Sequence, residues 1–194
     1  MAELTDIHST ETVAGSRLSA EGDVLIDGAT RRTLDDTRNS SGSNIDSTLT
    51  NSWVASSLSA QAITISGEDV TLVGAHLASP GVTRIAATGD LALDAGVDHS
   101  REHHLSTRSS GAFIEKLRVD ETLSESVLAH PTHIAASQVQ LVAGGDLDLY
   151  ASQLVSREAA ASLVAGGEVN LWAVEEQHYT LERHETSTNC HCRM

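Results

Sequence analysis

The chain has 194 residues, of which 40% are hydrophobic and only 3% aromatic, and it carries a formal net charge of −15 with a pI of about 4.9. Such an acidic chain lacks the clustered Lys and Arg that phosphate binding needs, so we expect no nucleic-acid partner and repulsion from anionic membranes. The two cysteines, Cys190 and Cys192, cannot form a disulfide framework, and no apolar run is long enough to span a bilayer.

The N-terminal residues, from Met1 to His8, have neither the basic nor the apolar region of a signal peptide. If the protein is exported, we therefore expect this chain to be an internal piece of something longer. Its apolar residues are mostly Ala, Val, Leu and Ile, and the branched ones suit a thin interior of stacked strands.

A short phrase recurs along the chain. It consists of an acidic residue, usually preceded by glycine, and of two apolar residues that follow it with one residue between them. Each copy indicates a turn followed by a strand, because period-two alternation places apolar side chains on one face and glycine supplies turn conformations. We interpret the acidic residue as turn chemistry at the entry to a strand, rather than as a ligand or catalyst. The copies occupy residues 22–26, 68–72, 89–93, 145–149 and 167–171.

The spacing of the phrase predicts a stack of parallel strands. Asp69 and Asp90 are 21 residues apart, and Asp146 and Glu168 are 22 residues apart. About twenty residues is the length that one coil of a parallel β-solenoid needs. The alternative is an antiparallel sandwich, which also alternates, although a sandwich does not demand similar phrases at equal spacing.

Two polar insertions interrupt this spacing, and a third begins at Glu175. The complete insertions lie within about residues 28–55 and 97–132. Their polar starts and Ser/Gly-rich middles favour long β-hairpins that leave the stack. The larger repeating unit is therefore two coils followed by one projecting hairpin.

Two segments fit this scheme less well. Over residues 113–130 a helix is the alternative to a hairpin strand, because Phe113, Leu117 and Leu128 partly fit helical spacing. Residues 187–194 match neither a coil nor an insertion. We expect this last segment to be a ragged tail after a repeat region that spans residues 1–186.

Histidines and cysteines invite a metal hypothesis, which the pattern does not support. Zinc needs three or four ligands in a fixed geometry, whereas the histidine cluster sits in a polar insertion. The Cys190-His191-Cys192 segment lies at the end of the chain, where any metal binding would be adventitious. We therefore expect no metal site and no cofactor. The cluster comprises His99, Glu102, His103 and His104.

Calcium and catalytic motifs are equally incomplete. The Gly-Gly-Asp turn at residues 144–146 lacks the nine-residue period of calcium-binding repeats. The sequence has no Gly-x-Ser-x-Gly nucleophile elbow. Carboxylate pairs at residues 35–36 and 175–176 lie in insertions, and Asp148 is the exception among mostly uncharged outward residues. We expect no catalytic residues and no enzyme activity; the alternative is a polysaccharide-active β-helix enzyme.

The ordered repetition resembles the haemagglutinin repeats of filamentous haemagglutinin-like exoproteins, the secreted partners of two-partner secretion, which include contact-dependent growth inhibition toxins. The similarity covers roughly residues 12–186 and rests on order rather than on one decisive motif. The tail departs from the family pattern. The segments that carry the resemblance are residues 60–95 and 135–173, with the phrases at 74–79, 141–149 and 151–156, and the charged run of residues 100–104 that leads to Ser-Gly-Ala-Phe at 110–113.

The resemblance implies a fold and a function. The family fold is a right-handed parallel β-helix, whose hand agrees with the general rule for parallel crossovers. Its members are fibrous proteins that are secreted or held at the bacterial cell surface as adhesins or toxin-delivery stalks. Implied partners are a protein or glycan receptor on a host or neighbouring cell, and the outer-membrane transporter that acts on the full-length protein. Uncapped coils also predict end-to-end self-association.

Overall fold

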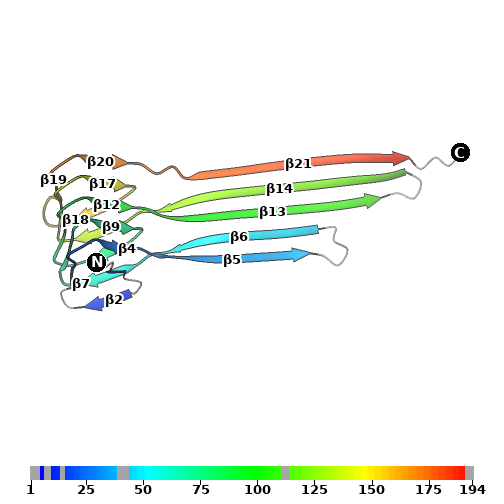
Figure 1. Ribbon diagram of the computed structural model, residues 1–194. Helices are drawn as coiled ribbons and strands as arrows, with labels where there is room; N and C mark the ends of the chain where they lie inside the picture. The colour runs from blue at the N-terminus through cyan, green and yellow to red at the C-terminus, as the bar shows by residue number, and fades with distance from the viewer. Residues whose placement is uncertain (1–4, 7–9, 14–15, 39–43, 111–113, 191–194) are drawn as a thin grey trace. The chain divides into compact units, whose positions relative to one another are not determined.

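The computed structural model describes residues 5–6, 10–13, 16–38, 44–110 and 114–190, and over these residues the chain is all-β without any helix (Figure 1). It divides into two compact units. The first comprises the residues up to Thr30, Trp53–Val97 and Ala129–Glu175; the second comprises Arg31–Ser52, Asp98–Leu128 and the residues from Glu176 on. No helix that could cross a membrane is found in the described part of the chain.

Three parallel sheets build the first unit. In spatial order, the first sheet holds β1 (Thr5–Asp6), β4 (Val24–Ile26), β9 (Val70–Val73), β12 (Leu91–Asp94), β17 (Leu147–Tyr150) and β20 (Val169–Trp172). The second holds β2 (Thr10–Val13), β7 (Ser57–Ala60), β10 (His76–Ala78), β15 (His133–Ala136) and β18 (Gln153–Ser156). The third holds β3 (Ser16–Ser19), β8 (Ile63–Gly67), β11 (Val82–Ala87), β16 (Gln138–Ala143) and β19 (Ser162–Ala165).

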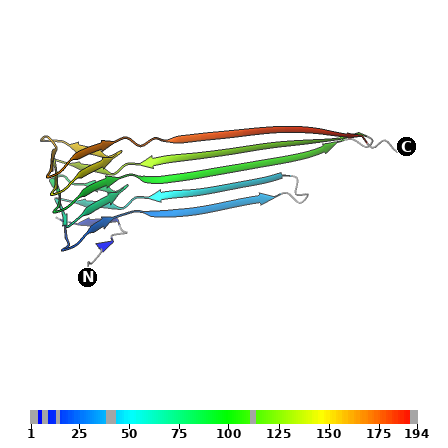
Figure 2. The ribbon, with the colours of Figure 1, turned by 45° about the horizontal axis from the view of Figure 1, so that its top comes forward.

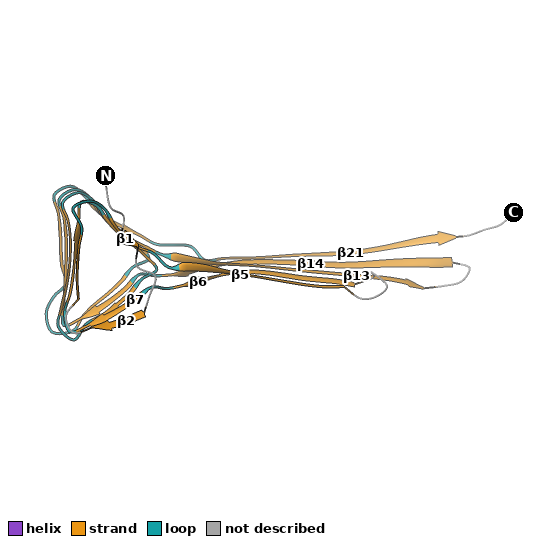
Figure 3. Ribbon diagram, turned by 60° about the horizontal axis from the view of Figure 1, so that its bottom comes forward, coloured by secondary structure: helices purple, strands orange, loops and turns teal. Residues whose placement is uncertain are grey.

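The chain visits the second, third and first sheets in turn, and we call each such set of three strands a rung. The rungs are β2–β4, β7–β9, β10–β12, β15–β17 and β18–β20. Figure 2 shows the strands of successive rungs stacked one above another, and Figure 3, seen along the stack, shows them one behind another. The parallel pairing confirms parallel sheets, and it rules out the antiparallel sandwich for this unit.

The core of the first unit is a set of aliphatic ladders between the three sheets. Alternation along each strand sends every second side chain inward, as in β8, where Ile63 and Ile65 are fully buried and Thr64 between them is not. Equivalent residues of neighbouring rungs then stack on one another in register, such as Ile65 beneath Ile85 and Ile85 beneath Leu141. This repetition excludes water without large aromatic side chains.

The acidic residue of the repeated phrase links the rung of β9 to that of β12, and each later rung to the next. The Oδ1 atom of Asp69 accepts a hydrogen bond from the backbone N–H of Asp90 at 2.8 Å, and Asp90 accepts one from Asp146 at 2.8 Å. Asp146 in turn accepts one from the N–H of Glu168 at 2.8 Å. These carboxylates form a column along the turns, which we call the carboxylate ladder. Charge-assisted bonds to backbone N–H groups are stronger than neutral ones.

Glycine precedes the acidic residue because the carboxylate of the rung below occupies the space of a side chain. A Cβ atom on Gly89 would lie 2.1 Å from Oδ1 of Asp69, and one on Gly145 would lie 2.1 Å from Oδ1 of Asp90. The same separation would hold for Gly167. The Gly-Asp phrase is therefore a pair of complementary positions, which explains its recurrence.

Trp53 closes the corner where the chain leaves and re-enters the first unit. A Cβ atom on Gly28 would lie 2.6 Å from the indole ring, and one on Gly74 or Gly96 would lie 2.3 Å from it. The indole N–H points to the carbonyl of Gly74 at 3.5 Å. Gly74 also has a positive φ of 52°, a conformation that glycine adopts at little cost. The absence of side chains at these three glycines thus leaves the space into which the indole ring of Trp53 packs.

Hydroxyl side chains fix the chain where it begins a new rung. Thr132, fully buried, donates to the carbonyl of Asp94 at 2.6 Å and accepts from the N–H of Ala75 at 3.3 Å. Ser152 donates to the carbonyl of Leu93 at 2.9 Å, and Ser56 bonds to that of Asp27. Because Ser56 and Thr132 follow the two insertions, these bonds restore the register of the stack after each one.

The second unit is a single sheet in the order β21–β14–β13–β6–β5. Its strands are β5 (Ala29–Arg38), β6 (Asn44–Val54), β13 (Gly96–Ser110), β14 (Ile114–His130) and β21 (Gln177–Cys190). The pairs β6–β13 and β14–β21 are antiparallel, and the arrows of neighbouring strands alternate in direction (Figures 1 and 2). The two complete insertions therefore contribute the strand pairs β5–β6 and β13–β14.

Two sequence-based expectations differ from this sheet. The helical alternative for residues 113–130 is wrong, because β14 is a continuous strand in which Leu117, Val119 and Leu123 share one face by period two; Phe113 lies outside the described residues. The ragged tail expected from residue 187 does not begin there either. The strand β21 continues to Cys190, since residues up to this point still pair with β14, and residues 191–194 lie outside the described part.

The carboxylate ladder predicts a conditional cost for filling a glycine. Gly145→Ala should lower the free energy of unfolding by about 1–3 kcal/mol, because its new Cβ collides with the Asp90 carboxylate. In an Asp90→Ala background the same change should cost far less, since the colliding atom is gone. Urea denaturation of the four proteins of this double-mutant cycle measures the coupling. Equal costs of Gly145→Ala in both backgrounds would contradict the packing described here.

Candidate functional site

The outer face of the first sheet carries an exposed aromatic pair. Tyr150 and Trp172 are neighbours in register across β17 and β20. Their rings are stacked, with centroids 5.9 Å apart and planes inclined by 12°. Tyr150 is 38% exposed and Trp172 is 52% exposed. An exposed, flat aromatic surface of this kind can contact a protein side chain or the apolar face of a sugar.

Two carboxyl groups, Asp94 and Asp148, share this outer face. Burial raises the pKa of Asp94, and the negative charge of Asp148 raises it further. Asp148 accepts a hydrogen bond from the side-chain amide of Asn170 at 3.0 Å. Two neighbouring carboxyl groups, one of which has a raised pKa, are an arrangement that general acid–base chemistry uses.

The sequence singled out Asp148 on this face and missed Asp94. The available signal was the alternation in β12, where Leu91 and Leu93 point inward and Ala92 lies on the outer face. Asp94 continues that alternation to the outside. Without the pairing of β12 with β17, nothing in the sequence places Asp94 close to Asp148.

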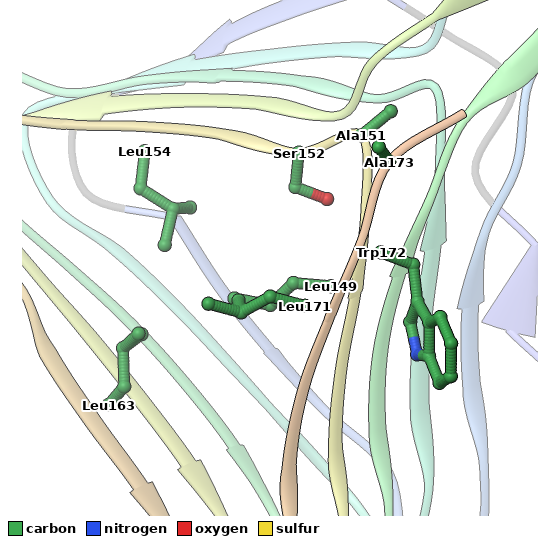
Figure 4. A pocket seen from close by; sticks show the side chains of 8 residues that line it. All are labelled: Leu149, Ala151, Ser152, Leu154, Leu163, Leu171, Trp172 and Ala173. Carbon is green, nitrogen blue, oxygen red and sulfur yellow. The ribbon is translucent and has the colours of Figure 1, made fainter. Parts of the chain in front are cut away.

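The last rung ends in an apolar opening. Leu171 in β20 is 72% exposed and Leu163 in β19 is 37% exposed. A cavity of about 460 Å³ lies between the ends of the three sheets. Figure 4 shows the side chains of Leu149, Leu154, Leu163 and Leu171 around this space, while Trp172 lies on the other side of its strand. The remaining lining residues are Ala151, Ser152, Trp172 and Ala173.

In the second unit, histidines pair with carboxylates across neighbouring strands. His99 bonds to Glu125 at 2.8 Å and His103 bonds to Glu121 at 2.9 Å, both between β13 and β14. The remaining pairs are His104 with Asp46, between β13 and β6, and His184 with Asp120 at 2.7 Å, between β21 and β14. The histidine cluster of the sequence is thus distributed over separate pairs.

These pairs are electrostatic contacts between neighbouring strands. Among the described residues, no group of three or more His, Cys, Asp or Glu side chains is arranged to hold a metal ion. The hydrogen bond from His184, with help from Arg118, lowers the pKa of Asp120. Since all these groups are partly or largely exposed, each pair contributes little to stability alone.

A second histidine contact lies on the outer face of the second sheet. His76 and His133 are register neighbours in β10 and β15, and their rings meet edge to face with centroids 6.0 Å apart. Partial burial lowers the pKa of His76, and the nearby His133 and His130 lower it further. Burial and the neighbouring histidines therefore favour the neutral form of the His76 imidazole.

The other residues considered from the sequence lie apart from these features. Asp35 and Asp36 are exposed in β5, and the pair at residues 175–176 is exposed between β20 and β21. Cys190 is the last residue of β21, whereas His191 and Cys192 lie outside the described residues. The Gly-Gly-Asp turn forms part of the carboxylate ladder, where the Asp146 carboxylate binds a backbone N–H.

Comparison with known proteins gives no relative on which to base an assignment. No family model, no curated protein and no solved structure matches the chain.

The environment of Asp94 predicts a pH-dependent effect of its neutralisation. Its pKa in the folded protein is raised above the ordinary 3.8 of an aspartate, so ionisation of this carboxyl costs folding free energy at every pH above that raised pKa. Asp94→Asn should therefore raise the free energy of unfolding at pH 7. Near pH 3, where Asp94 is largely protonated in both states, the gain should nearly disappear. Urea denaturation at the two pH values measures this, and a gain of equal size at both would contradict the inferred cause.

Proposed function

We propose that this chain is a structural and interaction segment of a secreted, fibrous bacterial surface exoprotein of the filamentous haemagglutinin-like class. In this proposal the three parallel sheets are the faces of a right-handed parallel β-helix. The right hand follows the general preference of parallel crossovers. The hairpin strands of the second unit are the part that meets a partner.

The observation that carries the proposal is the constancy of register across insertions. Leu91 pairs with Leu147 although the second insertion lies between them. Leu147 then pairs with Val169 only 22 residues later, without an insertion. A stack that accepts long insertions without a change of register is suited to presenting them, since each rung needs only its neighbours.

The sheet of the second unit has features of a contact surface. Tyr179 and Leu181 in the edge strand β21 are 53% and 46% exposed, and they lie opposite Glu125 and Leu123 of β14. Aromatic and aliphatic side chains bordered by charges are typical anchors in protein interfaces. We propose a protein or glycan receptor on a host or neighbouring cell as the partner, and an outer-membrane transporter as the export route of the full-length protein.

A second candidate function is a polysaccharide-active enzyme. The specific observation that favours it is the pair of Asp94 and Asp148 close to the stacked rings of Tyr150 and Trp172, because carboxyl pairs and aromatic platforms serve in glycoside chemistry. We rank it second, since it uses one face of one sheet and leaves the long strands of the second unit without a role.

Cell binding and turnover assays distinguish the two functions. The fluorescently labelled chain should bind saturably to bacterial or epithelial cells in flow cytometry. The double variant Tyr179→Ser/Leu181→Ser should bind at least about fivefold more weakly, because it removes the two apolar anchors of β21. The matched control, Val82→Ser/Val164→Ser, changes two exposed apolar residues of the other unit and should bind as the unaltered chain does.

The same preparation should release no reducing or unsaturated ends from acidic or neutral polysaccharides. Turnover that disappears in Asp148→Asn would replace the proposed function with the enzymatic one. Failure to bind any of the cell surfaces, or equal loss of binding in the control variant, would contradict the interaction role of β21.

A further inference from the structure

We infer that His76 and His133, on the outer face of the second sheet, form a binding site for a divalent transition-metal ion that prefers imidazole ligands, with Cu²⁺ bound most tightly. The ion would join β10, which precedes the second insertion, to β15, which follows it. This goes beyond the proposed function, because neither the display of the hairpin strands nor a receptor requires a metal.

The two histidines point to the same side of neighbouring strands. They are register partners in β10 and β15, and the side chains of register partners project to one face of a sheet. That face is the outer one, since the next residues, Leu77 and Ile134, are 1% and 0% exposed and point into the core. The imidazole rings already meet edge to face, with centroids 6.0 Å apart and planes inclined by 73°.

The spacing of the strands suits one shared ion. Neighbouring strands lie about 4.8 Å apart, and two nitrogens that each lie about 2.0–2.1 Å from one metal ion can be up to about 4.2 Å apart. Rotation of the His76 and His133 side chains can therefore direct one nitrogen of each ring to a common point without movement of the backbone.

The backbone holds both residues in place before any ion binds. The N–H of His76 donates to the carbonyl of Ser56 at 2.8 Å, and that of His133 donates to the carbonyl of Ala75 at 2.8 Å. Next to His133, the fully buried Thr132 accepts a hydrogen bond from the N–H of Ala75 at 3.3 Å. Ligands on strands that are fixed in this way lose little conformational freedom when they bind an ion.

The site also favours the form of imidazole that binds metals. Partial burial lowers the pKa of His76, and the neighbouring His133 and His130 lower it further. Metal ions bind neutral imidazole, so a lowered pKa means that fewer protons have to be displaced at neutral pH.

The histidines of the second unit are arranged differently. Each of four histidines there is bonded to a carboxylate in a separate pair, so an ion at any of them would meet one imidazole; these are His99, His103, His104 and His184. Within the described part of the chain, the ring contact between two histidines is that of His76 with His133. The sequence singled out neither residue, because the second insertion separates them.

Two imidazole ligands define which ions the site suits. The proposed site has two protein ligands and water, in keeping with the lack of any group of three or more His, Cys, Asp or Glu arranged for a metal among the described residues. A structural zinc site would need four protein ligands. Cu²⁺ accepts imidazole and water in tetragonal geometry, and it stands highest in the affinity order of the divalent first-row ions.

The test is a Cu²⁺ titration of the whole chain in a Cys190→Ser/Cys192→Ser background, which removes both thiols. Isothermal titration calorimetry at pH 7 should show one tight site per chain, with an affinity at least 10-fold lower in His76→Gln and in His133→Gln. The matched control His104→Gln removes a histidine that is paired with Asp46 in the second unit and should keep the tight site. Mg²⁺, which prefers oxygen ligands, should not compete.

Electron paramagnetic resonance gives a second readout that needs no histidine variant. The spectrum of one equivalent of bound Cu²⁺ should show coupling to two imidazole nitrogens. Coupling to a single imidazole would overturn the proposal. So would a tight site that persists in His76→Gln and His133→Gln, or one that is lost equally in His104→Gln.

Discussion

The structure of the first unit depends on one contact between successive rungs. An aspartate carboxylate of one rung packs against a glycine of the next rung, and it accepts a hydrogen bond from the N–H of the acidic residue that follows this glycine. The bond from Asp146 to Asp90 shows its range, because 56 residues separate the two positions. A carboxylate that is satisfied only in one alignment penalises a slip of the strand. In the core, equivalent aliphatic side chains of successive rungs then stack on one another. Because these side chains are small, they pack without specific shape complementarity.

This local rule explains how the chain combines a regular stack with irregular insertions. Residues outside a rung are not constrained by the ladder, so the length between two rungs can change while the pairing does not. At the corners, Trp53 fills the space beside the glycines, and the hydroxyls of Ser56 and Thr132 donate hydrogen bonds to backbone carbonyls. The strands of the second unit follow a different rule, with antiparallel pairing and His–carboxylate contacts.

The sequence predicted those features that repeat and missed those that depend on contacts between distant segments. The spacing of the phrase indicated strands and their parallel stacking, and the polar insertions indicated hairpins. Leu117 and Leu128 partly fit helical spacing, whereas Leu117 and Leu123 fit strand spacing, so periodicity alone did not decide β14. Two contacts arise only when rungs lie side by side, and no local pattern encodes them. They are the packing of Trp53 against three glycines and the approach of Asp94 to Asp148.

The most direct test of the account is a cross-link across the second insertion. In a Cys190→Ser/Cys192→Ser background, the pair Ala92→Cys/Asp148→Cys should form a disulfide readily, because these partly exposed residues are register neighbours in β12 and β17 and adjacent strands lie within disulfide reach. The pair Ala92→Cys/Gln140→Cys, which joins different sheets, should not. A cross-link that forms equally well in both pairs, or only in the second, would contradict the in-register parallel stack.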